Sequence, residues 1–140
     1  METQTFTLHN RLEEIEPLQE EIKYLLQARG VRLKHIHAIL LALGEWLENV
    51  ILHAYDDTAM HQIVVDLSAD EDEIRLSVSD DGTDFDLTEV ATTDQPIQPG
   101  QRIITGQGIR LVRNLMDHVE HQRRDGRNQV VLIKQVISQT

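Results

Sequence analysis

This chain of 140 residues contains no cysteine, only three prolines, and few aromatic residues, which make up 4% of it. Without cysteine there is no disulfide, no thiolate metal site and no cysteine nucleophile. Basic residues are also scarce, because 13 Lys and Arg stand against 24 Asp and Glu, for a formal charge of −11. So negative a charge argues against binding to nucleic acid such as duplex DNA, or to an anionic membrane surface.

Long hydrophobic runs are missing as well. No apolar stretch approaches the ~18 residues of a membrane span, and residues 1–10 (METQTFTLHN) lack the apolar core of a signal peptide. We therefore expect a cytoplasmic protein. A length of 140 residues is close to the roughly 150 of one average domain and predicts a single domain over residues 1–140.

The charges are divided unevenly along the chain. Residues 1–99 hold 6 basic and 21 acidic side chains, whereas residues 100–140 hold 7 and 3, so the net charge changes from −15 to +4. This division suits a protein whose last third meets an anionic ligand. The simpler interpretation is that Arg123, Arg124 and Arg127 merely decorate an exposed hairpin, and for these three arginines we favour it.

Three stretches repeat apolar residues every three or four positions, as amphipathic helices do. The first follows Asn10, which can act as its N-cap, and ends at Gly30. It starts either at Pro17 or near Arg11 with a kink at the proline. The other two helices are predicted over residues 33–55 and 106–118.

Five stretches alternate apolar or β-branched residues with polar ones, as strands do. They are residues 3–8, as an edge strand, 63–67, 73–79, 119–123 and 128–137. Asp125-Gly126 is a strong hairpin turn between the last two. Residues 80–105 lack periodicity, which is typical of a functional or disordered loop. This order predicts an α+β fold, a two-layer α/β sandwich with helices on one face of a mainly antiparallel sheet.

Glu45, Asn49 and His53 follow one another at intervals of four, so they lie along one stripe of the second helix. An acid and an amide within an apolar face are costly to bury without partners. Mg²⁺ is one such partner, because it binds carboxylate and amide oxygens. The alternative is an exposed strip of an amphipathic helix, with Glu48 on the same solvent side, and these residues alone favour it.

Two glycine-containing segments border the long loop. Asp80 ends a strand, where a carboxylate can accept a hydrogen bond from an exocyclic amine such as that of adenine, and Gly82 lets a ring approach the backbone. Asp-Asp-Gly is also a common turn. At the other border, Gly106 and Gly108 open a helix whose N-terminal amides can bind phosphate. Alternatively, Thr105 is an ordinary N-cap.

Together these residues resemble a known family. Glu-x-x-x-Asn on a helix, Asp-x-Gly after a strand and Gly-x-Gly at a helix start, in this order, are similar to the motifs of the Bergerat-fold (GHKL) ATP-binding proteins, which include histidine kinases and gyrase. Stretches such as ALGEWLENVILHAYDD and VSDDGTDFDL most resemble the stand-alone anti-sigma-factor serine/threonine-protein kinases of that superfamily. The resemblance extends over nearly the whole chain.

The resemblance implies a role for each of the helix and strand residues. Asn49 would ligate Mg²⁺. Glu45 would act as general base and draw the proton from an attacking serine hydroxyl or water. Asp80 would bind the amino group of adenine, and Gly82 would pack beneath the ring. His53 would be a lesser contact of the nucleotide.

The resemblance also implies how the phosphates of ATP are held. Gly106 and Gly108 would donate backbone amides to them under a lid formed by residues 86–105, from which Arg102 could reach the terminal phosphate. The chain departs from the pattern where Asp84 replaces the second glycine of Asp-x-Gly-x-Gly, and where Thr105 stands in place of a glycine common in the subgroup. Neither departure removes a residue named above.

The resemblance implies a kinase that uses ATP and Mg²⁺ to phosphorylate a serine on a STAS-domain anti-anti-sigma partner, and that sequesters a sigma factor or another regulator when free. The alternative is an ATP-dependent binding switch without efficient phosphotransfer, but Glu45 favours the kinase, since a pure binder needs no base. The 44 residues before Glu45 leave no room for the phosphoacceptor module of a histidine kinase. His35 and His37 are interpreted as packing or surface residues. The polar first strand could pair with its twin in a homodimer.

Overall fold

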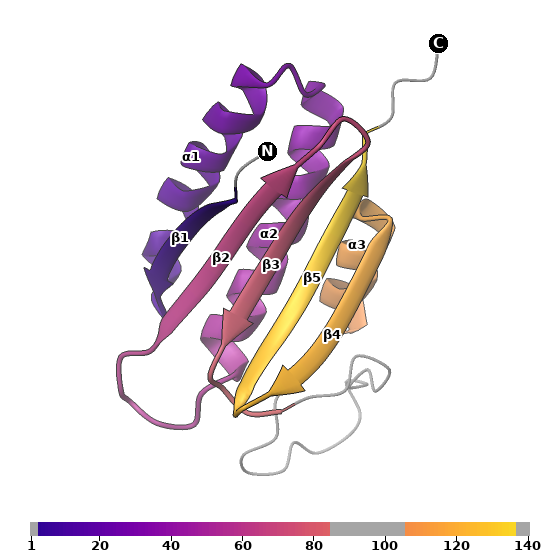
Figure 1. Ribbon diagram of the computed structural model, residues 1–140. Helices are drawn as coiled ribbons and strands as arrows, with labels where there is room; N and C mark the ends of the chain where they lie inside the picture. The colour runs from indigo at the N-terminus through magenta and orange to yellow at the C-terminus, as the bar shows by residue number, and fades with distance from the viewer. Residues whose placement is uncertain (1–2, 85–105, 137–140) are drawn as a thin grey trace.

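The computed structural model describes residues 3–84 and 106–136, which form a five-stranded sheet with helices on one face (Figure 1). The sheet is antiparallel throughout, in the order β1-β2-β3-β5-β4, and the predicted α+β sandwich is confirmed. The predicted lid, with Arg102, lies outside the described residues. The elements are β1 (Gln4–His9), a short 3-10 helix (Leu12–Glu14), α1 (Ile15–Ala28), α2 (Leu33–His53), β2 (Gln62–Ala69), β3 (Glu73–Asp80), α3 (Gly106–Leu115), β4 (His118–Arg124) and β5 (Arg127–Gln135).

Alternation along the strands decides which side chains enter the core. On β3 the apolar residues Ile74, Leu76 and Val78 are fully buried, and a similar alternation runs along β5. Successive side chains of a strand point to opposite faces of the sheet. The same period therefore carries Asp80 to the inner face at the end of β3, and Asn128 to the inner face at the start of β5, where both are fully buried.

The central helix of the core is α2, which packs against both α1 and α3. By length and composition alone it could cross a membrane, so the expectation that no apolar stretch approaches that length was wrong for residues 33–53. Core helices pass the same test, and α2 has one face packed inside this protein. Its buried residues are Ile36, Ile39, Ala42, Leu43, Trp46, Leu47 and Val50.

The start of α1 differs from both predicted alternatives. The 3-10 helix precedes it and α1 begins at Ile15, which places Pro17 in the first turn, where the missing N–H costs little. The prediction that Asn10 caps this helix was wrong. Its Oδ1 instead accepts a hydrogen bond from the N–H of His61 (2.9 Å), just before β2. The side chain therefore joins the end of β1 to the segment that enters β2.

The other boundaries agree closely with the sequence. Gly30, with φ of +80°, follows the end of α1 as predicted, since a glycine adopts this left-handed conformation without steric cost. The second and third helices end at His53 and Leu115, a few residues before their predicted ends. β1 lies at an edge of the sheet, as expected.

Candidate functional site

Two neighbouring helices carry most of the predicted site residues. α2 carries Glu45, Asn49 and His53 and packs along α3, which begins at Gly106 as predicted. The three side chains are half-buried, whereas Glu48 is exposed. The stripe therefore lies at the boundary between core and solvent, where a polar group can meet a ligand without the full cost of burial.

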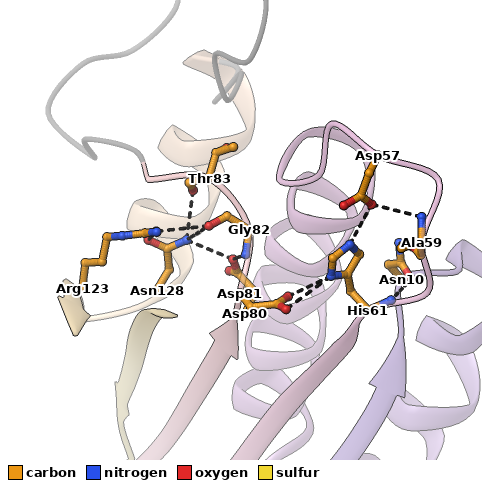
Figure 2. A network of polar contacts seen from close by, with 10 residues as sticks. All are labelled: Asn10, Asp57, Ala59, His61, Asp80, Asp81, Gly82, Thr83, Arg123 and Asn128. Carbon is orange, nitrogen blue, oxygen red and sulfur yellow. Dashed lines mark hydrogen bonds and ion pairs between the residues drawn. The ribbon is translucent and has the colours of Figure 1, made fainter. Parts of the chain in front are cut away.

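A buried polar network lies at the end of β3 (Figure 2). The Oδ1 of Asp80 accepts hydrogen bonds from the N–H of Gly82 (2.9 Å) and from Nδ2 of Asn128 (3.0 Å). The same Nδ2 lies within hydrogen-bond distance of the carbonyl oxygens of Gly82 (3.2 Å) and Thr83 (2.9 Å). Asp80 and Asn128 are directly paired between β3 and β5. The Asn128 amide thus fixes both the carboxylate and the turn that follows it.

Arg123 extends this network from β4. Its Nη1 donates to the carbonyl oxygen of Gly82 (3.1 Å) and to Oδ1 of Asn128 (3.0 Å). Arg123, Arg124 and Arg127 are all exposed as expected, but the interpretation that Arg123 merely decorates the hairpin was wrong, because its side chain donates to Gly82 and Asn128. Sequence reasoning missed Arg123 and Asn128 as site residues. Alternation along β5 could have assigned Asn128 to the core face, but nothing local could have named its partner.

Packing against α2 explains why position 82 is a glycine. A Cβ on Gly82 would lie 2.5 Å from the carbonyl oxygen of Ala54 and 2.6 Å from its Cβ. The next residue, Thr83, donates its N–H to that same carbonyl oxygen (2.8 Å). The end of β3 is thereby fastened to the residue that follows His53. Packing of Gly82 beneath an adenine ring stays a prediction.

A second polar cluster, centred on His61, lies beside the first (Figure 2). Nε2 of His61 is 2.7 Å from Oδ1 of Asp57, and Nδ1 is 3.1 Å from Oδ1 of Asp81. The ring stacks on Tyr55 with centroids 4.1 Å apart. The hydrogen bond to Asp57 raises the pKa of His61, against the effect of burial and with help from Asp81. The hydrogen bond to His61 lowers the pKa of Asp57. The cluster holds the connection between α2 and β2 against the end of β3.

The donor chemistry fits a magnesium–nucleotide complex. Mg²⁺ keeps several waters and takes further ligands from phosphates, so one protein oxygen such as that of Asn49 is sufficient. Within residues 3–84 and 106–136, no three His, Asp or Glu side chains gather to hold a metal by themselves. α3 begins at Gly106, and the N-terminal amides of a helix are suited to binding phosphate. Asp80 is fully buried in this structure, so its carboxylate is not open to a ligand such as adenine.

The chain is similar to known proteins in sequence and in fold. Residues 8–134 match the histidine kinase-like ATPase domain. The chain is 31% identical over 99 residues to the serine/threonine-protein kinase BtrW of Bordetella bronchiseptica, a match that covers 67% of this chain and 66% of BtrW. It is 28% identical over 95 residues to the serine-protein kinase RsbW of Oceanobacillus iheyensis, covering 65% of this chain and 60% of that kinase. The chain thus matches less than two thirds of the length of either kinase.

The fold has a solved counterpart. A crystal structure of the RsbU and RsbW domains of a Mycobacterium tuberculosis protein matches 96% of this chain and 32% of that one, with a TM-score of 0.68 and 18% sequence identity. At this identity the likeness concerns the fold alone.

Proposed function

The chain belongs to the histidine kinase-like ATPase domain family, and on that basis we propose that it is an ATP- and Mg²⁺-dependent protein kinase. Its substrate is a serine on a STAS-domain anti-anti-sigma partner, and when free it sequesters a sigma factor or another regulator. The similarity to two proteins named as serine kinases supports phosphotransfer. The observation that carries the proposal is that Glu45 and Asn49 share one stripe of the helix that packs along α3.

The transfer assigns distinct tasks to these two side chains. Asn49 would ligate Mg²⁺, which would offset the negative charge of the phosphates. Glu45, one helical turn earlier, accepts the proton of the serine hydroxyl while the hydroxyl oxygen bonds to the terminal phosphorus. The bond between that phosphorus and the ADP oxygen breaks. Its electron pair leaves with ADP, and the serine proton stays on the Glu45 carboxylate. Backbone amides of Gly106 and Gly108 hold the phosphates.

The buried network at the end of β3 recognises the adenine ring of ATP. Asp80 accepts a hydrogen bond from the exocyclic amine of adenine. Asn128 and Arg123 act as positioning residues, because their hydrogen bonds orient the carboxylate and the Gly82 carbonyl. His53, half-buried next to the Ala54 contact, is a lesser contact of the nucleotide, and so is Arg102.

The decisive experiment incubates the purified protein with radiolabelled ATP, Mg²⁺ and candidate STAS proteins. We expect labelled phosphate on a serine of one of them. Glu45→Gln lowers the transfer rate about 10²- to 10⁴-fold, the usual contribution of a general base, and leaves ATP affinity unchanged. The matched control is Glu48→Gln, which removes an exposed acid from the same helix and preserves transfer.

A second variant tests the metal site separately. Asn49→Ala abolishes the Mg²⁺-dependent part of ATP affinity in calorimetry while circular dichroism shows an intact fold. Unchanged affinity in this variant contradicts the role of Asn49. ATP binding without transfer to any STAS protein contradicts the kinase and supports the ATP-dependent binding switch.

A further inference from the structure

A cleft lies at the opposite end of the sheet from Asp80. Its volume is about 830 Å³, and it is bordered by the α1–α2 corner, the β2–β3 turn and the end of β5. Figure 1 shows these three segments side by side at the upper end of the molecule, whereas β3 ends at the lower end. The cleft is therefore separate from the candidate nucleotide site.

Four cationic side chains line this cleft, although the chain as a whole carries a charge of −11. They are Arg29, Arg32, Lys34 and Lys134. None of the four takes part in the ion pairs formed within the described ranges 3–84 and 106–136. Arg29 and Lys134 donate to the backbone carbonyl oxygens of Ala69 (3.5 Å) and Leu115 (2.7 Å), respectively.

Three acidic side chains also line the cleft, Asp70, Glu71 and Asp117, and two of them accept backbone hydrogen bonds. Oδ1 of Asp70 accepts the N–H groups of Asp72 (2.7 Å) and Glu73 (2.9 Å) and closes the β2–β3 turn. Oδ2 of Asp117 accepts the N–H of Gln135 (2.7 Å). These hydrogen bonds orient the two carboxylates but leave their charges in the cleft, together with that of Glu71, so its four cations exceed its three acids by one.

The pKa of His35, which also lines the cleft, reflects its burial and the excess of cations there. Burial first, and then the charges of Lys34, Lys134 and Arg32, lower the pKa of this histidine, and only Asp117 opposes them. Lys34 also lies in the first turn of α2, which has no acidic residue. A cation is unfavourable at the positive end of a helix dipole. The helix dipole therefore does not account for the placement of Lys34.

We propose that this cleft binds an acidic peptide segment of a partner protein. Carboxylates of the segment pair with the unpaired cations, and its apolar side chains meet the apolar groups of the lining, Val31, Ile74 and Val136. A volume of about 830 Å³ exceeds the size of one phosphate group, and the mixed charged and apolar lining suits a peptide. The site does not depend on nucleotide binding at the other end of the sheet.

The test uses the full chain without nucleotide and a fluorescein-labelled acidic hexapeptide, Glu-Leu-Glu-Glu-Leu-Glu, with acetylated and amidated ends. In ¹⁵N spectra the peptide shifts the amides of residues 29–35, 69–71 and 134–136, and leaves those of Asp80 and Asn128 in place. The double variant Arg32→Glu/Lys34→Glu weakens binding at least about tenfold, as loss of close opposite charges does. The neutral pair Arg32→Gln/Lys34→Gln gives a smaller loss in the same direction.

A control with the same change of net charge separates a built site from general attraction. Arg124→Glu/Arg127→Glu alters two exposed arginines of the distant hairpin and changes affinity less than about twofold. Equal losses in the two double variants, or no shifts in the three named segments, overturn the proposal. Tighter binding of inorganic tripolyphosphate than of the peptide to these segments also overturns it, because the site then serves a small polyanion.

Discussion

The two ends of the sheet differ in how their polar side chains are placed: those at one end are buried, and those at the other are exposed. At the end of β3, Asp80 and Asn128 are fully buried and hydrogen-bonded to each other. At the other end, Arg32 and Lys34 stand exposed beside an open cleft, without an ion pair among the described residues.

This difference separates two kinds of recognition. A buried network holds its groups in one geometry, and leaving any of its members unsatisfied is expensive. Exposed cations hold no geometry, and their attraction weakens with salt. The first end is therefore suited to orienting a small ligand, and the second to attracting a charged segment. Substitutions should destabilise the first end and spare the second.

The largest effect is expected for Asn128→Ala. This variant removes the donor shared by Asp80, Gly82 and Thr83 in a buried site. We expect a loss of about 3 kcal/mol in the free energy of unfolding, from two or more unsatisfied buried groups, together with weaker ATP binding. Urea denaturation measures the loss. The control is Gln129→Ala, on the opposite face of the same strand, which costs less than about 1 kcal/mol. Equal costs for the two variants would show that the network is not special.

A smaller effect is expected for Gly82→Ala. The new Cβ would overlap the backbone oxygen and the Cβ of Ala54, at 2.5 and 2.6 Å, so β3 and α2 must separate. We expect a cost of about 2 kcal/mol, in the range of overpacked cores. Gly126→Ala is the comparison, because its φ is +74° and nothing lies within 4 Å of the added Cβ. There only backbone strain remains, about 1 kcal/mol. Thermal denaturation of both variants decides between overlap and strain.

At the end of the sheet that carries the cleft, we expect a substitution to stabilise the protein instead of destabilising it. Lys34→Glu places an acid in the first turn of α2 and removes a cation from a positive cleft. We expect the protein to gain about 0.5 kcal/mol at low salt, and the pKa of His35 to rise, because Lys34 contributes to lowering it. Urea denaturation and an NMR titration of the histidine measure the two effects. Arg124→Glu in the hairpin changes neither. A destabilised Lys34→Glu variant would mean that this lysine supports the fold.

The smallest effect is a pH dependence from the cluster beside the buried network. Since the folded state raises the pKa of His61, its contribution is complete below the unfolded pKa of about 6.5 and is lost as pH rises through the folded value. The lowered pKa of Asp57 means that its contribution is lost as pH falls through that value. His61→Gln should therefore destabilise more at about pH 5.5 than at about pH 8.5. The exposed His37, changed to Gln, serves as the control. A larger cost at the higher pH would contradict this assignment.

The sequence predicted the fold further than the site. Among the described residues, apolar periodicity placed the three α-helices and five strands within a few residues, but not the 3-10 helix, because it depends on near neighbours along the chain. The same reasoning located Glu45, Asn49 and His53 on one stripe, which the structure places at the edge of the core. It failed for Asn10. Its side chain binds the backbone of His61, far along the chain, and does not cap the helix that follows it.

For the candidate site, the sequence by itself determined which face each residue takes. A period of two puts Asp80 and Asn128 on the inner face of their strands, whatever the rest of the chain does. Only the tertiary structure decided that they meet, because strand register is set by the packing of the whole sheet. It likewise brought Arg123 to the Gly82 carbonyl, and Lys134 to the same cleft as Lys34. Such contacts join residues far apart in sequence, and local preferences carry no information about them.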